Sequence, residues 1–274
     1  METKRPRPIV ASAVFSLVVI AGLPPAYAQL PSGLTPEEGQ SLLHLRLVST
    51  AVKAYQTDHG NYPGPTEGYV PADSIRGSLE PVYINELPTH DGWGNEILYS
   101  FDGSRASVLS HGGDGLADLD YTTIPTDDSL NAGDDLVWTT EELVLVPEHV
   151  RLAIDLDSQK RTMADIRSVA VAVESYKIDN GVCPGPTEDH VDASFLREFV
   201  QPMYIRTLPV ADAWGNGLLY WSDGEHYRIV SNGRDGEAEE PYDAVVDGTV
   251  INSLDGDIIF VDGAFVQWPE GPQS

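Results

Sequence analysis

The sequence predicts an α+β protein of two similar halves, each a long N-terminal helix packed on a small antiparallel sheet. Three observations support this fold class. The chain has 274 residues, enough for two domains of ordinary size. Its second half repeats the first at a shift of 121 residues. Within each half, apolar residues at helical spacing give way to short runs with the spacing of strands.

The internal repeat covers most of the chain. Between Leu45 and Gly115, 32 of 71 positions are identical to the residue 121 positions later. Near the C-terminal end the matching shift is 122, so the second copy carries one inserted residue in its later part. We therefore expect two tandem domains, residues 34–148 and 157–270, joined by a short linker at 149–156.

Residues 1–28 have the pattern of a secretory signal peptide. Basic residues precede the apolar run 9–23, and Ala26-Tyr27-Ala28 supplies a small-x-small cleavage pattern. The run is shorter than the roughly 20 residues that a membrane-spanning helix needs. An uncleaved membrane anchor is the alternative interpretation. We expect export to the periplasm or the medium, with no membrane span after cleavage.

Each copy is expected to open with a helix. In the first copy, Thr35 is the candidate N-cap and Pro36 the first helical residue. In the second copy, Ser158 is the candidate N-cap, and an apolar stripe follows in both. Gly60 and Gly181 are expected to end the two helices, because glycine readily adopts the left-handed conformation found at helix C-termini.

After the helices, both copies are expected to contain one short helix and two hairpins. Asp-Gly pairs at 102–103, 223–224 and 262–263 mark hairpin turns. The expected short helices are 72–79 in the first copy and 193–200 in the second. The expected strands are 97–101, 106–110, 136–138 and 143–146 in the first copy, and 218–222, 227–231, 258–261 and 265–268 in the second.

Composition excludes several classes of function. The chain has 16 Lys and Arg against 43 Asp and Glu, a formal net charge of −27, which repels nucleic acids and anionic membranes. The single cysteine, Cys183, excludes an intramolecular disulfide and a cysteine-based zinc site. No nucleophile elbow, phosphate-binding glycine loop or zinc-protease motif is present. We expect no enzymatic activity.

An ordered set of short motifs recurs along the chain. In the first copy the set is Tyr55-x-x-Asp58-x-Gly60-x-Tyr62-Pro63, Thr66-Glu67, Tyr83-Ile84, Leu87-Pro88, Asp91-x-Trp93-Gly94-Asn95, Ser110-x-Gly112-x-Asp114-Gly115 and Gly133-Asp134-Asp135-Leu136. This order resembles the globular head of the major pseudopilin of type II secretion systems, protein G, over about 42–138 and again over 163–260. The resemblance implies a pilin-head fold, a structural role and protein partners in the secretion apparatus or the envelope.

The chain also departs from that family. Pseudopilins begin with a short basic leader, a glycine cleavage site and a long apolar assembly helix, and the sequence shows none of these. The family has one head per subunit, whereas two are expected here. We therefore expect that this chain does not polymerise as a pilus shaft.

Two acidic loops follow the first hairpins of the two copies. The first acidic loop, residues 111–135, has seven Asp and no Lys or Arg. The second acidic loop, residues 232–257, has eight Asp and Glu against one basic residue, Arg234. Clustered like charges oppose ordering, and a hard divalent cation would offset them. Calcium accepts irregular sets of oxygen ligands, whereas magnesium requires a stricter octahedron.

The resemblance implies calcium in the first acidic loop, because the pseudopilin head holds calcium in the corresponding loop. Carried over by motif, the carboxylate ligands are Asp114, Asp134 and Asp135. In the second copy the matching residues are Asp235, Asp255 and Asp257, with Gly256 altering the spacing. Solvated acidic loops without metal are the alternative for both copies.

The leading hypothesis is an exported, non-enzymatic protein of two pseudopilin-head-like domains, connected with type II secretion or a related pilus-like apparatus. A second hypothesis is an independent, calcium-dependent extracellular module that binds a protein or a glycan. A third, a hydrolase, has the weakest support.

Overall fold

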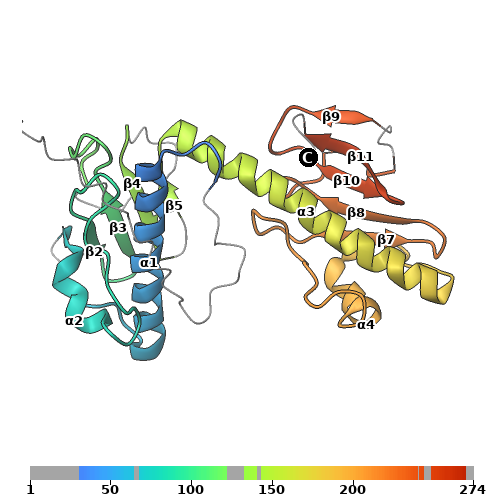
Figure 1. Ribbon diagram of the computed structural model, residues 1–274, viewed down its shortest axis with the longest axis horizontal. Helices are drawn as coiled ribbons and strands as arrows, with labels where there is room; N and C mark the ends of the chain where they lie inside the picture. Colours follow the sequence, from blue (N-terminus) through green and yellow to red (C-terminus); the bar gives the residue numbers. More distant parts are fainter. Residues whose placement is uncertain are drawn as a thin grey trace, which may run out of the picture. The chain divides into compact units, whose positions relative to one another are not determined.

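The computed structural model describes residues 31–64, 68–121, 133–140, 143–239, 241–243 and 248–269. The predicted signal peptide, 1–28, lies outside these residues. The described chain forms two compact units: the first runs from Pro36 to Val146, and the second contains Pro31–Thr35 and the chain from Pro147 onward. Each unit has α-helices and one sheet, which confirms the α+β class (Figure 1).

The first unit is a long helix packed on a five-stranded antiparallel sheet. Helix α1 (Pro36–His59) begins at the residue that the sequence indicates and packs on β3 and β4 (Figure 1). The sheet order is β1-β2-β3-β4-β5. The other elements are β1 (Val70–Pro71), η2 (Ala72–Ile75), α2 (Arg76–Leu79), β2 (Leu98–Phe101), β3 (Ala106–Ser110), β4 (Leu136–Thr139) and β5 (Leu143–Leu145).

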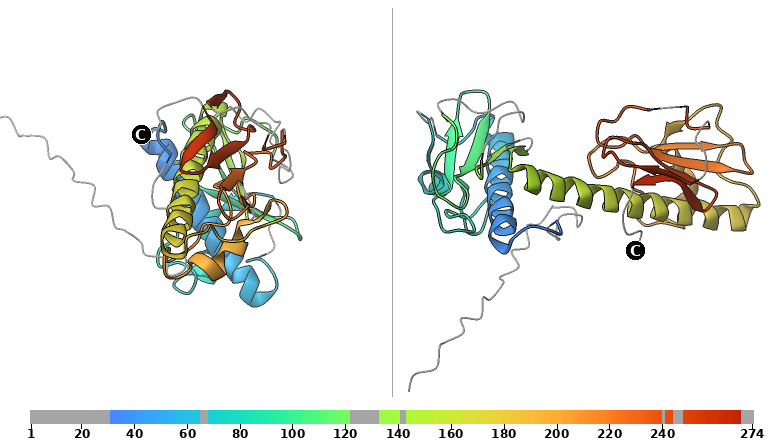
Figure 2. Two further views of the ribbon diagram at one scale, coloured as in Figure 1. Left: turned by 90° about the vertical axis from the view of Figure 1, so that its right-hand side faces the viewer. Right: turned by 90° about the horizontal axis from the view of Figure 1, so that it is seen from above.

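The second unit repeats this arrangement and adds a strand. Helix α3 (Glu148–Asn180) lies along a six-stranded sheet of order β6-β7-β8-β10-β11-β9 (Figure 2). The other elements are β6 (Val191–Asp192), η3 (Ala193–Leu196), α4 (Arg197–Val200), β7 (Leu219–Ser222), β8 (Tyr227–Ser231), β9 (Thr249–Ile251), β10 (Ile258–Val261) and β11 (Ala264–Pro269).

Helix α3 starts ten residues before the N-cap that the sequence indicates. Its N-cap is Pro147, so the predicted linker at 149–156 is wrong: these residues are helical. Two features explain the extension. Val150 and Ala153 are buried, and Asp155, only 8% exposed, accepts a hydrogen bond from the indole N–H of Trp214 at 3.2 Å. Tertiary contacts of this kind override a boundary inferred from capping residues alone.

The second sheet is mixed and not purely antiparallel. Strand β9 pairs in parallel with β11 through Thr249–Gln267 and Trp268–Val250. The sequence predicts a loop at 249–251, because the three residues are too few to show a strand period. All other pairings in both sheets are antiparallel, as expected.

Equivalent residues of the two units occupy equivalent places. The hydroxyl of buried Tyr99 donates to the carbonyl of Pro63 at 3.1 Å, and that of Tyr220 donates to Pro184 at 2.9 Å. In both units an apolar helix stripe is buried against the sheet. No helix within the described ranges has the length and apolarity required to cross a membrane.

Candidate metal centre

A buried aspartate holds the base of the first acidic loop. One carboxylate oxygen of Asp91 accepts from the backbone N–H of Trp93 at 3.0 Å and of Asn95 at 2.8 Å. The other accepts from the hydroxyl of Ser110 at 2.6 Å. Since Asp91 is only 4% exposed, these donors replace its water shell. The contacts join the 93–95 turn to the end of β3, where the loop begins.

The second unit contains the same network. Asp212 accepts from the backbone N–H of Trp214 at 3.0 Å and of Asn216 at 2.9 Å, and from the hydroxyl of Ser231 at 2.7 Å. The side-chain amide of Asn216 donates to the carbonyl of Gly233 at 2.8 Å. The conformation of each Trp-Gly-Asn turn thus depends on the aspartate two residues before its tryptophan.

A close backbone approach brings the two ends of each loop together. Gly112 has φ +56°, and a Cβ there would lie 2.2 Å from the carbonyl oxygen of Asp134. Gly233 has φ +66°, and its Cβ would lie equally close to the carbonyl oxygen of Asp255. Only glycine fits at these positions. The first acidic residues of each loop are therefore close to the last ones.

Three carboxylates converge in the first acidic loop. Asp118, Asp134 and Asp135 each offer one oxygen, and these oxygens lie within 4.8 Å of one another. Asp134 accepts from the backbone N–H of Gly113 at 2.5 Å and of Asp114 at 3.1 Å. Asp118 accepts from the backbone N–H of Asp134 at 2.9 Å. The donor set is all oxygen, which suits a hard divalent cation such as calcium.

Asp135 is the buried member of this group. One of its oxygens accepts from the hydroxyl of Tyr121 at 2.5 Å and from the backbone N–H of Asp118 at 2.8 Å. Nδ1 of His111 lies 3.3 Å from the other oxygen. Burial raises the pKa of Asp135 above its usual range. Tyr121 and Leu119 also pack on the sheet, so this part of the loop is anchored.

The three predicted residues of the first loop therefore have different places. Asp134 and Asp135 lie in the converging group, whereas exposed Asp114 accepts from the backbone N–H of Leu116 at 2.7 Å and lies outside it. Asp118 was not expected. One signal could have indicated it: the residue 121 positions later, Glu239, is also acidic.

The second acidic loop is arranged differently. Asp255 forms an ion pair with Arg234, in which Nε lies 2.8 Å from Oδ1. Asp235 accepts from the backbone N–H of Glu237 at 3.0 Å. Within the described part of this loop, Asp235, Asp255 and Asp257 do not form a converging group like that of the first loop.

Asp257 is a buried carboxylate with an incomplete set of partners. It is 1% exposed, and its Oδ2 accepts from the backbone N–H of Glu239 at 3.2 Å. Its Oδ1 is buried and has no hydrogen-bond partner among the described residues. Burial above all, with repulsion from Glu239 and Asp235, raises the pKa of Asp257 to about 6.

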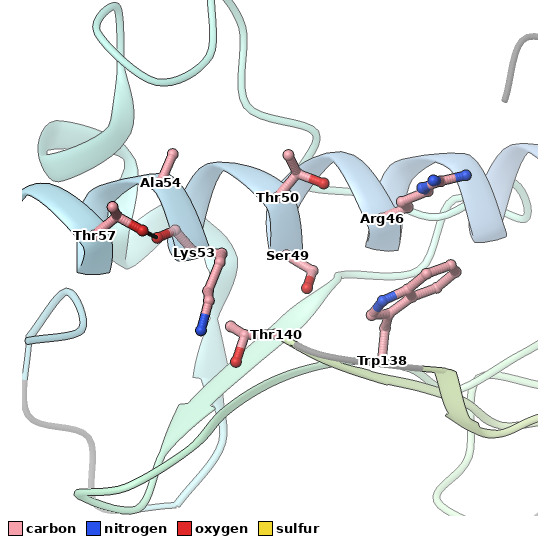
Figure 3. A pocket seen from close by; sticks show the side chains of 8 residues that line it. All are labelled: Arg46, Ser49, Thr50, Lys53, Ala54, Thr57, Trp138 and Thr140. Atoms are coloured by element: carbon pink, nitrogen blue, oxygen red, sulfur yellow. Dashed lines mark hydrogen bonds between the residues drawn. The ribbon is translucent and has the colours of Figure 1, made fainter. Parts of the chain in front are cut away.

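A shallow hollow lies between α1 and β4 of the first unit. It has a volume of about 410 Å³ and is lined by Arg46, Ser49, Thr50, Lys53, Ala54, Thr57, Trp138 and Thr140 (Figure 3). Its lining combines two cations with hydroxyls, and the guanidinium of Arg46 lies 5.9 Å from the Trp138 ring centroid. The equivalent of Lys53 in the second unit is Glu174, so the two units do not share this lining.

Cys183 is buried in the core of the second unit. Burial raises the pKa of its thiol, which favours the unreactive form.

Comparison with known proteins gives one result. Residues 152–247 match the family model of type II secretion system (T2SS), protein G. The matched stretch lies within the second unit and supports the pseudopilin head expected there. No curated protein and no solved structure gives a significant match to the chain.

We predict that Asp91→Ala lowers the free energy of unfolding of the first unit by about 2–4 kcal/mol, because three donors lose their acceptor: the part-buried backbone N–H groups of Trp93 and Asn95 and the buried hydroxyl of Ser110. Asp212→Ala is expected to do the same in the second unit. Urea unfolding measures both. Asp73→Ala is the control: its carboxylate is exposed and pairs with the partly exposed Arg76, so the loss is expected to stay below about 1 kcal/mol. Equal losses for all three variants would contradict the assigned role.

We predict that Asp257→Asn stabilises the protein at pH 7.5 by about 1–3 kcal/mol in the presence of a chelator. A raised pKa means that the folded state binds a proton more tightly than the unfolded state. The resulting stabilisation is full below pH 4 and falls as the pH rises to about 6. The amide removes this loss, so the gain is expected to vanish at pH 4. Unfolding curves at the two pH values test this, and a pH-independent gain would contradict it.

Proposed function

We propose that this chain is an exported, non-enzymatic protein of two tandem pseudopilin-head-like domains. Its role is structural or binding, beside the type II secretion apparatus or a related pilus-like machine. The observation that carries the proposal is the family match over residues 152–247. Periplasmic or extracellular location and protein partners follow from the same family.

The first unit supports the tandem arrangement. Its element order matches that of the second unit from the long helix through the second hairpin, apart from the added β9. Its Asp91 network and its Tyr99 contact have counterparts at a shift of 121 residues. We take the two domains to be copies of one ancestral head, because unrelated sequences would not share buried polar networks at one constant shift.

Calcium binding in the first acidic loop forms part of the proposal. Asp118, Asp134 and Asp135 supply the carboxylates, and no Lys or Arg of the loop offsets their charge. A divalent ion would neutralise the repulsion between these side chains and bridge the two ends of the loop. The ion would therefore order this loop without taking part in any reaction.

We expect saturating calcium to raise the melting temperature of the protein by several degrees, and excess chelator to remove this gain. Binding at a hundredfold excess over Kd contributes about 2.7 kcal/mol. Differential scanning fluorimetry measures the shift. Asp134→Asn is expected to abolish the response, whereas Asp73→Asn, a change on the exposed surface, is expected to keep it. A wild-type protein that shows no shift would remove the calcium assignment.

The proposed role predicts specific partners. We expect the purified protein, immobilised and exposed to envelope extract from its own organism, to retain pseudopilin or secretion-channel subunits, identified by mass spectrometry. Resin that carries no bait is the control. Retention of glycans or unrelated proteins in their place would favour the independent calcium-dependent module and overturn the secretion role.

A further inference from the structure

The second acidic loop has a cation of its own. Arg234 occupies the position that corresponds to Gly113 of the first loop at the shift of 121 residues. Its Nε lies 2.8 Å from Oδ1 of Asp255, and a terminal nitrogen lies 3.2 Å from Oδ2. Both oxygens of Asp255 thus face the guanidinium in a bidentate pair, the strongest geometry for this kind of contact.

The same guanidinium also reaches helix α3. Its other terminal nitrogen lies 3.1 Å from Oδ2 of Asp155, whose side chain is 11% exposed. The remaining oxygen of Asp155 accepts from the indole of Trp214. Arg234 therefore links the loop to the N-terminal part of α3 and, through Asp155, to the 214–216 turn. The contacts with Asp255 raise the pKa of Arg234, so it keeps its charge.

The described residues of the second loop do not fit a divalent ion. Asp255 corresponds to Asp134, since both carbonyl oxygens lie against the equivalent glycines, Gly233 and Gly112. Asp134 is held by backbone N–H groups and remains available to a cation, whereas Asp255 is engaged by a guanidinium. Gly256 then separates Asp255 from Asp257, whereas Asp134 and Asp135 are adjacent.

Asp257 alone does not make a site. Its acidic neighbours Asp235 and Glu239 do not form a converging set with it in the described residues. A calcium ion needs six to eight oxygens. With Asp255 paired to Arg234, the described part of the second loop offers no carboxylate that converges with Asp257.

We propose that Arg234 takes the place of a metal ion in the second acidic loop, so that the protein binds a single calcium ion, in the first unit. The ion count depends on the proposed calcium site; the role of Arg234 in holding the second loop does not.

A reciprocal exchange on the full chain tests the proposal, with isothermal titration calorimetry to count calcium ions. The wild type is expected to bind one. Gly113→Arg is expected to bind none, because an arginine there reaches Asp134. A Cβ at Gly113 would lie 3.3 Å from Oδ2 of Asp134 and 3.4 Å from Nε1 of Trp93, so these two side chains have to shift slightly to admit it. Arg234→Gly combined with deletion of Gly256, which makes Asp255 and Asp257 adjacent like Asp134 and Asp135, is expected to bind two. A wild type that binds two ions, or a folded form of this combined variant that still binds one, overturns the proposal.

A second measurement does not depend on calcium. In excess chelator, Arg234→Gln is expected to lower the melting temperature, Asp255→Asn to lower it less, and the double variant to match Arg234→Gln, because both changes break one pair. Arg105→Gln, which breaks an exposed pair with Asp102, is the control and is expected to have little effect. If the wild type binds no calcium, the calcium assignment fails, and the melting temperatures in chelator then test the role of Arg234 by themselves. An unchanged melting temperature for Arg234→Gln overturns that role.

Discussion

The buried carboxylates of Asp91 and Asp212 are the contacts on which each unit depends. Each accepts three hydrogen bonds from elements that are far apart in the sequence: a tight turn after the short helix and the last residue of a central strand. Desolvating an aspartate is costly, and only complete hydrogen bonding offsets it. Satisfying these carboxylates therefore fixes where each acidic loop leaves the sheet, before the loop's own charges have any effect.

Much of the fold could be predicted from the sequence because its signals are local. Helix α1 begins at Pro36, the residue that the sequence indicates, and the Asp-Gly turns place the hairpins. Prediction failed where long-range contacts decide the structure. The start of α3 depends on Asp155, whose partners Trp214 and Arg234 lie more than fifty residues away. Strand β9 forms only because β11 offers an edge beside it.

The candidate site likewise combines residues that a sequence motif identifies with one that only long-range contacts place. A motif carried over from a family identified Asp134 and Asp135, which do converge, but it also indicated Asp114, whose side chain instead closes its own turn. Asp118 could not be predicted as a ligand from the short motifs, because none of them contains it. Its place depends on Asp135, which accepts from its backbone N–H, and on Leu119, which packs on the sheet. Neither contact can be derived from spacing along the chain.

The two acidic loops illustrate two solutions to one electrostatic problem. In a chain of net charge −27, carboxylates that meet at the base of a loop need positive charge nearby. A guanidinium supplied by the chain is present whenever the loop folds, so its contribution does not vary with the surroundings. A divalent ion contributes only as far as its free concentration allows. If the second loop carries Arg234 and the first takes up calcium, only the first unit changes its stability with the free calcium concentration. Any partner that contacts the first loop would then bind in a calcium-dependent manner, while the second unit provides a constant surface.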